Sequence, residues 1–144
     1  MKLKSFGIWP ALALFAVTTA CTKESPTRPS EGTASGQTAS VTDATTGVTL
    51  TSPSLVTPAA NQQFKNVDQP VTLTIKNAVT SGTTALTYTF EVASDAAFGT
   101  KVYSKDGVAA GSGTTSLKID KLTANKAYFW RARAQSGSLA GPCS

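Results

Sequence analysis

Three side chains near the C-terminal end of this chain have the types and spacing that suit binding. Phe129, Arg131 and Arg133 occupy alternate positions, so in an extended segment they lie on one face. An aromatic ring beside two guanidinium groups can contact a protein partner or a glycan, and these residues form the candidate binding surface. The alternative is a solvated sheet face on which long side-chain stems cover the strand and bind no partner.

The side chains that most enzymes and metal sites need are scarce. The sequence has no histidine, the most common general base and metal ligand. Its two cysteines are too few for a zinc site, which needs about four ligands. Asp95, Asp106 and Asp120 fall where strands end or turn, and Asp is common there for local hydrogen bonds. We therefore expect no catalytic residue, no metal and no cofactor, and hence no enzymatic activity.

The N-terminal residues have the pattern of a secretory signal peptide. Lys2 and Lys4 supply positive charge, residues 6–17 form an apolar run, and small residues lead up to Ala20. The apolar run is shorter than the roughly 20 residues that a membrane-spanning helix needs. We expect residues 1–20 to be removed during export.

Cys21 follows these small residues directly, an arrangement that resembles the lipobox of bacterial lipoproteins. The resemblance implies that Cys21 carries lipid, which anchors the exported chain in a membrane of the cell envelope, at the outer membrane or cell surface. Ala20 fits the family pattern, whereas Thr18 stands where the family prefers Leu. The alternative is ordinary cleavage after Ala20, which would release a soluble exported protein.

Cys143 is the second cysteine, and it has no partner within the chain if Cys21 carries lipid. Two interpretations follow: a surface thiol without a role, or an intermolecular disulfide. Association through Cys143 therefore stays open, as does the oligomeric state.

Charge and composition divide the rest of the chain. The formal charge of +5 falls to +3 once Lys2 and Lys4 leave with the signal peptide, and no basic cluster suggests nucleic-acid binding. Residues 21–47 are rich in Ser, Thr, Pro and Gly and poor in large apolar residues, which predicts a flexible linker. Residues 48–144 then form a single domain.

Alternating apolar and polar residues predict β-strands throughout that domain. The segments with this period are residues 71–75, 86–92, 102–103, 117–119 and 128–134. No window has a helical period, so we expect an antiparallel all-β sandwich. The predicted inward-facing side chains are Val71, Leu73, Ile75, Leu86, Tyr88, Phe90, Val92, Leu117, Ile119, Leu122, Tyr128 and Trp130.

The segment around Leu122, Tyr128 and Trp130 resembles a fibronectin type III domain. Leu122 precedes Tyr128 by six residues, the spacing of that family's corner between strands E and F. The resemblance implies an immunoglobulin-like sandwich in which these three residues have structural roles. It also implies a tyrosine corner, in which the Tyr128 hydroxyl bonds back to the corner backbone.

The same alignment leaves the chain without the family's last strand, G. Residues 136–144 would form only a loop and leave one edge of strand F open to edge-strand association. We expect a binding or spacer domain displayed at the cell surface, with an unidentified protein or glycan as partner. The alternative is an N-terminal fragment of a larger secreted adhesin or extracellular enzyme, with this domain as an accessory, glycan-binding module.

Overall fold

The computed structural model describes residues 38–144, and these residues form short strands joined by turns. The predictions for the signal peptide and for Cys21 lie outside the described residues. In chain order the elements are β1 (Ser40–Thr42), β2 (Thr49–Thr51), β3 (Ser54–Thr57), η1 (Asn66–Asp68, a 3-10 helix), β4 (Thr72–Lys76), β5 (Leu86–Ala93), β6 (Lys101–Ala109), β7 (Thr114–Lys118), β8 (Phe129–Ser136) and β9 (Leu139–Cys143).

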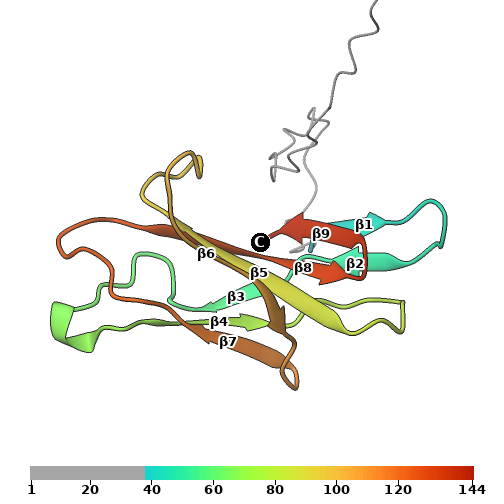
Figure 1. Cartoon of the computed structure of the whole chain (residues 1–144), viewed down its shortest axis with the longest axis horizontal. Coiled ribbons are helices and arrows are strands. Elements are labelled where there is room, and N and C mark those ends of the chain that lie inside the picture. Colours follow the sequence, from blue (N-terminus) through green and yellow to red (C-terminus); the bar gives the residue numbers. More distant parts are fainter. Residues whose placement is uncertain (1–37) are drawn as a thin grey trace, which may run out of the picture.

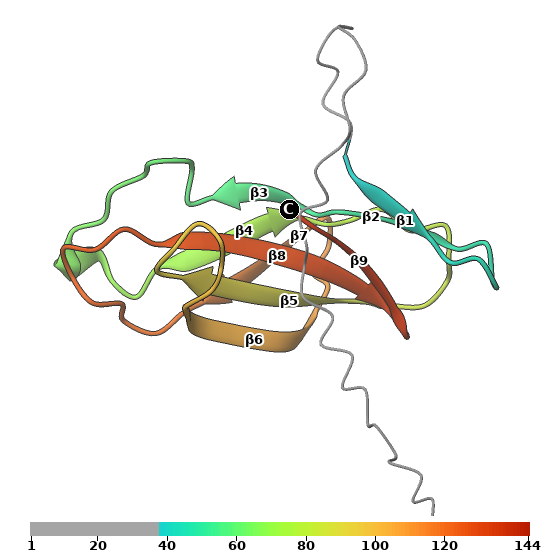
Figure 2. The same ribbon diagram turned by 90° about the horizontal axis from the view of Figure 1, so that it is seen from above.

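The strands form two packed antiparallel sheets and a separate hairpin. One sheet has the order β3-β4-β7 and the other has the order β6-β5-β8-β9. Figure 1 shows the two sheets as layers, with the β1–β2 hairpin beside β9 at one end. The view from above shows the same hairpin next to β9 (Figure 2). The expected all-β antiparallel sandwich is confirmed.

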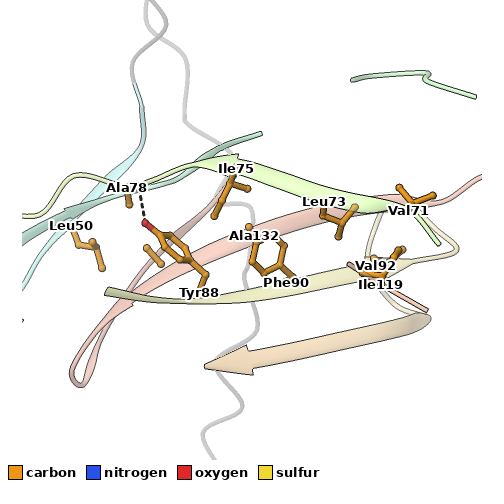
Figure 3. Close-up of a cluster of buried hydrophobic side chains, with 11 residues drawn as sticks. Leu50, Val71, Leu73, Ile75, Ala78, Tyr88, Phe90, Val92, Ile119 and Ala132 are labelled. Carbon is orange, nitrogen blue, oxygen red and sulfur yellow. Dashed lines mark hydrogen bonds between the residues drawn. The ribbon is translucent and has the colours of Figure 1, made fainter. Parts of the chain in front are cut away.

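The core lies between the two sheets because each central strand turns alternate side chains inward. Leu73 and Ile75 of β4 face Tyr88, Phe90 and Val92 of β5 across the layer (Figure 3). Burying each such side chain contributes roughly 1.5–3 kcal/mol. The predicted core is confirmed. Five of the predicted inward residues lie at its margins and are only half-buried, namely Leu86, Leu117, Leu122, Tyr128 and Trp130.

A buried hydrogen bond joins the two sheets inside this core. The Tyr88 side chain is fully buried, and its hydroxyl accepts a hydrogen bond from the Ala78 backbone N–H at 2.9 Å (Figure 3). Ala78 follows β4, so the bond satisfies a buried donor where that strand leaves the sheet. Burial of Tyr88 raises the pKa of its hydroxyl. The hydrogen bond from Ala78 lowers that pKa, but by less than burial raises it.

The turn before β8 contains the hydrogen bond that is expected of a tyrosine corner. The Tyr128 hydroxyl donates a hydrogen bond to the Thr123 carbonyl oxygen at 3.1 Å. Asn125 occupies the turn with φ of +57°, a conformation that Asn tolerates better than most residues. Leu122 is held nearby, because its N–H donates to the Gln69 side chain at 2.6 Å.

The prediction that the last strand is missing is wrong. Residues Leu139–Cys143 form β9, which pairs with β8 from Ser136↔Leu139 to Arg133↔Cys143. The sequence does not reveal this strand, because Gly141 and Pro142 interrupt any alternating pattern. Gly137 makes the tight turn with φ of +60°, and the edge of β8 supplies the pairing groups. The expected open edge of strand F therefore does not exist.

The predicted end of the linker at residue 47 is also wrong. Residues Ser40–Thr42 form β1, which pairs with β2, so part of the range expected to be flexible is a paired strand. The Asp43 carboxylate accepts hydrogen bonds from the N–H groups of Thr45 and Thr46 and closes the hairpin turn. Leu50 anchors the hairpin because its side chain is fully buried in the sandwich core.

We predict that Tyr88→Phe lowers the free energy of unfolding by about 1–3 kcal/mol, because the buried Ala78 N–H loses its acceptor. Urea denaturation of the two proteins measures the difference. Tyr103→Phe is the matched control, since the Tyr103 hydroxyl forms no hydrogen bond within residues 38–144. Equal destabilisation by the two substitutions would contradict the proposed importance of the Ala78 bond.

Candidate binding surface

The three residues of the candidate binding surface lie on the outer face of β8, as their spacing predicts. Phe129, Arg131 and Arg133 alternate with inward residues, of which Ala132 and Ala134 are almost completely buried. Residue Phe129 is 41% exposed. Alternation along the strand is enough to place these three residues on one face. The cross-strand register decides which side chains of the neighbouring strands contact them.

Strand β5 supplies the neighbours of these residues. Thr89 lies opposite Arg133, and Glu91 lies opposite Arg131 in the antiparallel register. On the other side of β5, Lys101 of β6 forms an ion pair with Glu91. Thr89 is buried although it belongs to the outer face, which indicates that the long side chains around it cover the sheet.

Glu91 is the centre of a charge cluster. The Arg131 Nη2 atom lies 2.6 Å from Glu91 Oε2, and Arg131 Nε donates to the same oxygen at 2.7 Å. The side chains of Glu91 and Arg131 are each 13% exposed, whereas that of Lys101 is 46% exposed. Two cations therefore share one carboxylate, so this part of the surface keeps an excess of positive charge.

The pKa of Glu91 lies below its ordinary value. Burial is the largest single effect and raises the pKa, but the hydrogen bonds and charges of Lys101 and Arg131 together outweigh it. Glu91 is therefore ionised over the physiological pH range and holds Arg131 in place.

The loop between β5 and β6 fixes Arg131 from the other side. The Arg131 guanidinium carbon lies 4.1 Å from the centroid of the Phe98 ring, a cation–π contact. Phe98 has φ of +58°, and the loop is held by Asp95, whose carboxylate accepts from the N–H groups of Gly99 and Thr100. These hydrogen bonds lower the pKa of Asp95, and the bond from Gly99 has the largest effect.

Arg133 differs from Arg131 because no carboxylate among residues 38–144 pairs with it. It lines a shallow depression of about 30 Å³ together with Thr89, Lys101 and Cys143. The depression is too small for an organic ligand, so any partner must contact the surface as a whole. Arg133 and Phe129 are the two side chains of the candidate surface that remain available for a partner.

Sequence reasoning missed Glu91, Lys101 and Phe98 as parts of this surface. The alternation of residues 86–92 places Glu91 on an outer face, which was the available signal. The sequence does not reveal that β5 pairs with β8 in the register that joins Glu91 to Arg131.

Cys143 at the end of β9 is disulfide-bonded, so its interpretation as a free surface thiol is wrong. Its partner lies outside residues 38–144. Within that range no cluster of three or more acidic or cysteine side chains is placed to hold a metal ion. The same residues contain no helix long and apolar enough to cross a membrane.

A wider groove of about 390 Å³ lies at the end of the sandwich where the β1–β2, β4–β5 and β8–β9 connections meet. Most of its lining residues are small, bearing hydroxyl groups or no side chain, as Thr83, Thr84 and Gly137 illustrate. Asp43 is the charged residue of the lining, and its own hairpin turn uses its carboxylate. The groove therefore has no charge arrangement comparable to that around Glu91.

We predict that Glu91→Gln lowers the free energy of unfolding by about 1–3 kcal/mol near pH 7, because Arg131 loses a largely buried counter-ion. The folded-state pKa is depressed, so the stabilisation by Glu91 is present above its ordinary value of about 4.5 and is lost as the pH falls through the folded-state pKa. The difference between the proteins should therefore narrow in acid, as measured by urea denaturation at several pH values. Asp106→Asn, at an exposed position of β6, is the control. A difference that does not change with pH would exclude the ion pairs as its cause.

Comparison of the chain with protein families, with curated proteins and with solved structures finds no match. The fold and the surface geometry are therefore the basis for any statement about function.

Proposed function

We propose that this chain is a non-catalytic lipoprotein of the cell envelope that displays a fibronectin type III-like binding domain. The strand order supports the domain assignment, since β3-β4-β7 corresponds to strands A, B and E and β5-β8-β9 to strands C, F and G. The hydrogen bond of the Tyr128 hydroxyl to Thr123 supports it further. The leader and the small residues before Cys21 support export and lipid attachment.

The binding role depends on the positive charge of the outer face of β8. Lys101 and Arg131 share Glu91, and Arg133 has no counter-ion within the described residues. The half-exposed Phe129 ring extends the same face. A cationic face beside an exposed ring favours an acidic partner, because charge complementarity speeds encounter and selects against cationic partners.

The two arginines of the candidate surface have different roles. Arg131 is held by Glu91 and Phe98, so it shapes the surface and contributes charge without being free to move. Arg133 has no such restraint from a described residue and is the side chain that contacts the acidic group of a partner. Binding should therefore depend on Arg133 more than on any lysine of the other sheet.

We predict that Arg133→Gln weakens binding to dextran sulfate, used as a polyanionic probe, more than Lys76→Gln does. Each substitution removes one positive charge, but Lys76 is exposed on β4 of the opposite sheet. The salt concentration at which each variant leaves a dextran sulfate column measures the effect. Equal shifts for the two variants would show that net charge alone drives retention and that the surface has no special role.

We predict that mass spectrometry of the chain from its native envelope finds a diacyl or triacyl group on Cys21 at the mature N-terminus. A lipid on the Cys21 sulfur excludes a disulfide at the same atom, so the spectrum distinguishes the two states. Cys21→Ser should move the protein from the membrane fraction to the soluble fraction. An unmodified or disulfide-bonded Cys21 would overturn the lipoprotein assignment.

A further inference from the structure

The sandwich has four sheet edges, and three of them carry features that prevent pairing with another chain. Strand β3 is short, lies between Pro53 and Pro58 and has a register irregularity. Strand β9 contains Pro142 and lies beside the β1–β2 hairpin (Figure 1). Strand β6 pairs irregularly with β5 and carries charged side chains. Prolines, bulges and charges are the usual devices that protect sheet edges.

Strand β7 has fewer of these devices than the other three edges. It pairs with β4 over five residues without a register shift, contains no proline and has Lys118 as its single charged residue. No strand of the described chain lies on its other side, and Figure 1 shows β7 at the margin of its sheet. Strand β7 is therefore a regular edge whose protection is limited to Lys118.

The hydrogen bonds at both ends of the β4–β7 pair show which backbone groups point away from β4. The Ile119 N–H donates to the Val71 carbonyl, and the Asn77 N–H donates to the Gly113 carbonyl. Directly opposite residues of an antiparallel pair alternate between bonded and non-bonded pairs, so the odd-numbered residues of β7 bond to β4. The N–H and C=O groups of Ser116 and Lys118 therefore point to the free edge.

Thr114 is the third even-numbered residue of β7, and its backbone carbonyl oxygen is less accessible. A Cβ atom at Gly111 would lie 2.3 Å from the Thr114 carbonyl oxygen, so the turn before β7 covers that oxygen. Two residues, Ser116 and Lys118, thus present one donor and one acceptor each, and no described residue bonds to these groups.

We propose that the free edge of β7 pairs with β7 of a second copy of this chain, antiparallel and with the two-fold axis at Leu117. Ser116 then lies opposite Lys118 of the other copy, and four backbone hydrogen bonds form because each residue exchanges a donor and an acceptor. The edge is self-complementary in this register, and the two Lys118 side chains do not face each other.

The side chains around the axis fit the same register. Ser116 and Lys118 are exposed on the outer face, so their pairing needs no rearrangement of the core. Leu117 is half-buried at the margin of the core and would face Leu117 of the second copy on the inner side. The contact covers apolar surface that the single chain leaves partly open to water.

The test uses opposite charges at one position. In this register Ser116→Glu places a carboxylate opposite Lys118 of the other copy twice, whereas Ser116→Lys places like charges there twice. Both variants lose the same hydrogen bond between the hydroxyls of Ser116 and Thr74, so they are matched in what they remove. Each such cross-strand charge pair changes the free energy of association, and the symmetric dimer contains two of them. Together they should change the dissociation constant by about tenfold or more.

The full chain and both variants are compared by sedimentation velocity in density-matched detergent, with a reductant that removes any covalent dimer through Cys143. We expect reversible dimers, tighter for Ser116→Glu than for the parent and weaker for Ser116→Lys, with dissociation constants at least about tenfold apart. Monomers at every concentration, or equal dissociation constants for the two variants, would overturn the proposal. Ser116→Pro, which removes an edge N–H that β4 does not use, should abolish the dimer and leave the melting temperature nearly unchanged.

Discussion

The packing of β5 against β4 is the constraint on which the rest of the structure depends. Tyr88 and Phe90 are fully buried between the sheets, and the Tyr88 hydroxyl satisfies the Ala78 N–H where the chain leaves β4. A shift of β5 by one residue would expose both rings and bury Thr89 and Glu91 in the core. The inward side of β5 therefore decides which of its side chains face solvent.

The same constraint decides which charged side chains lie on the outer face of the sheet. With Phe90 directed inward, Glu91 must face outward, and the β5–β8 register brings it to Arg131. Glu91 also accepts Lys101 from β6, so one carboxylate organises cations from two neighbouring strands. The positive charge left at Arg133 is the property that we link to binding, while the free edge of β7 concerns the opposite sheet.

Particular residues show how far sequence patterns reach. The family resemblance carried by Leu122 and Tyr128 implied a hydrogen bond from Tyr128 to the corner backbone, and this local contact depends on few residues. Strand β9 was beyond the pattern, since a segment containing Gly141 and Pro142 gains its extended form from pairing with β8. Gly141 has a tertiary role as well: a Cβ there would lie 3.1 Å from a methyl group of Leu50, so glycine allows the hairpin to pack.

The sequence alone determined the all-β class, most of the core and the shared face of Phe129, Arg131 and Arg133, because alternation along a strand is a local property. The tertiary structure decided that Arg131 is bound while Arg133 lacks a described counter-ion, and that residues 40–42 form a strand. It also decided which strands lie at the edges of the two sheets. Partners, registers and edges arise from contacts between residues far apart in the chain, and the pattern within one strand carries no information about which strand lies beside it.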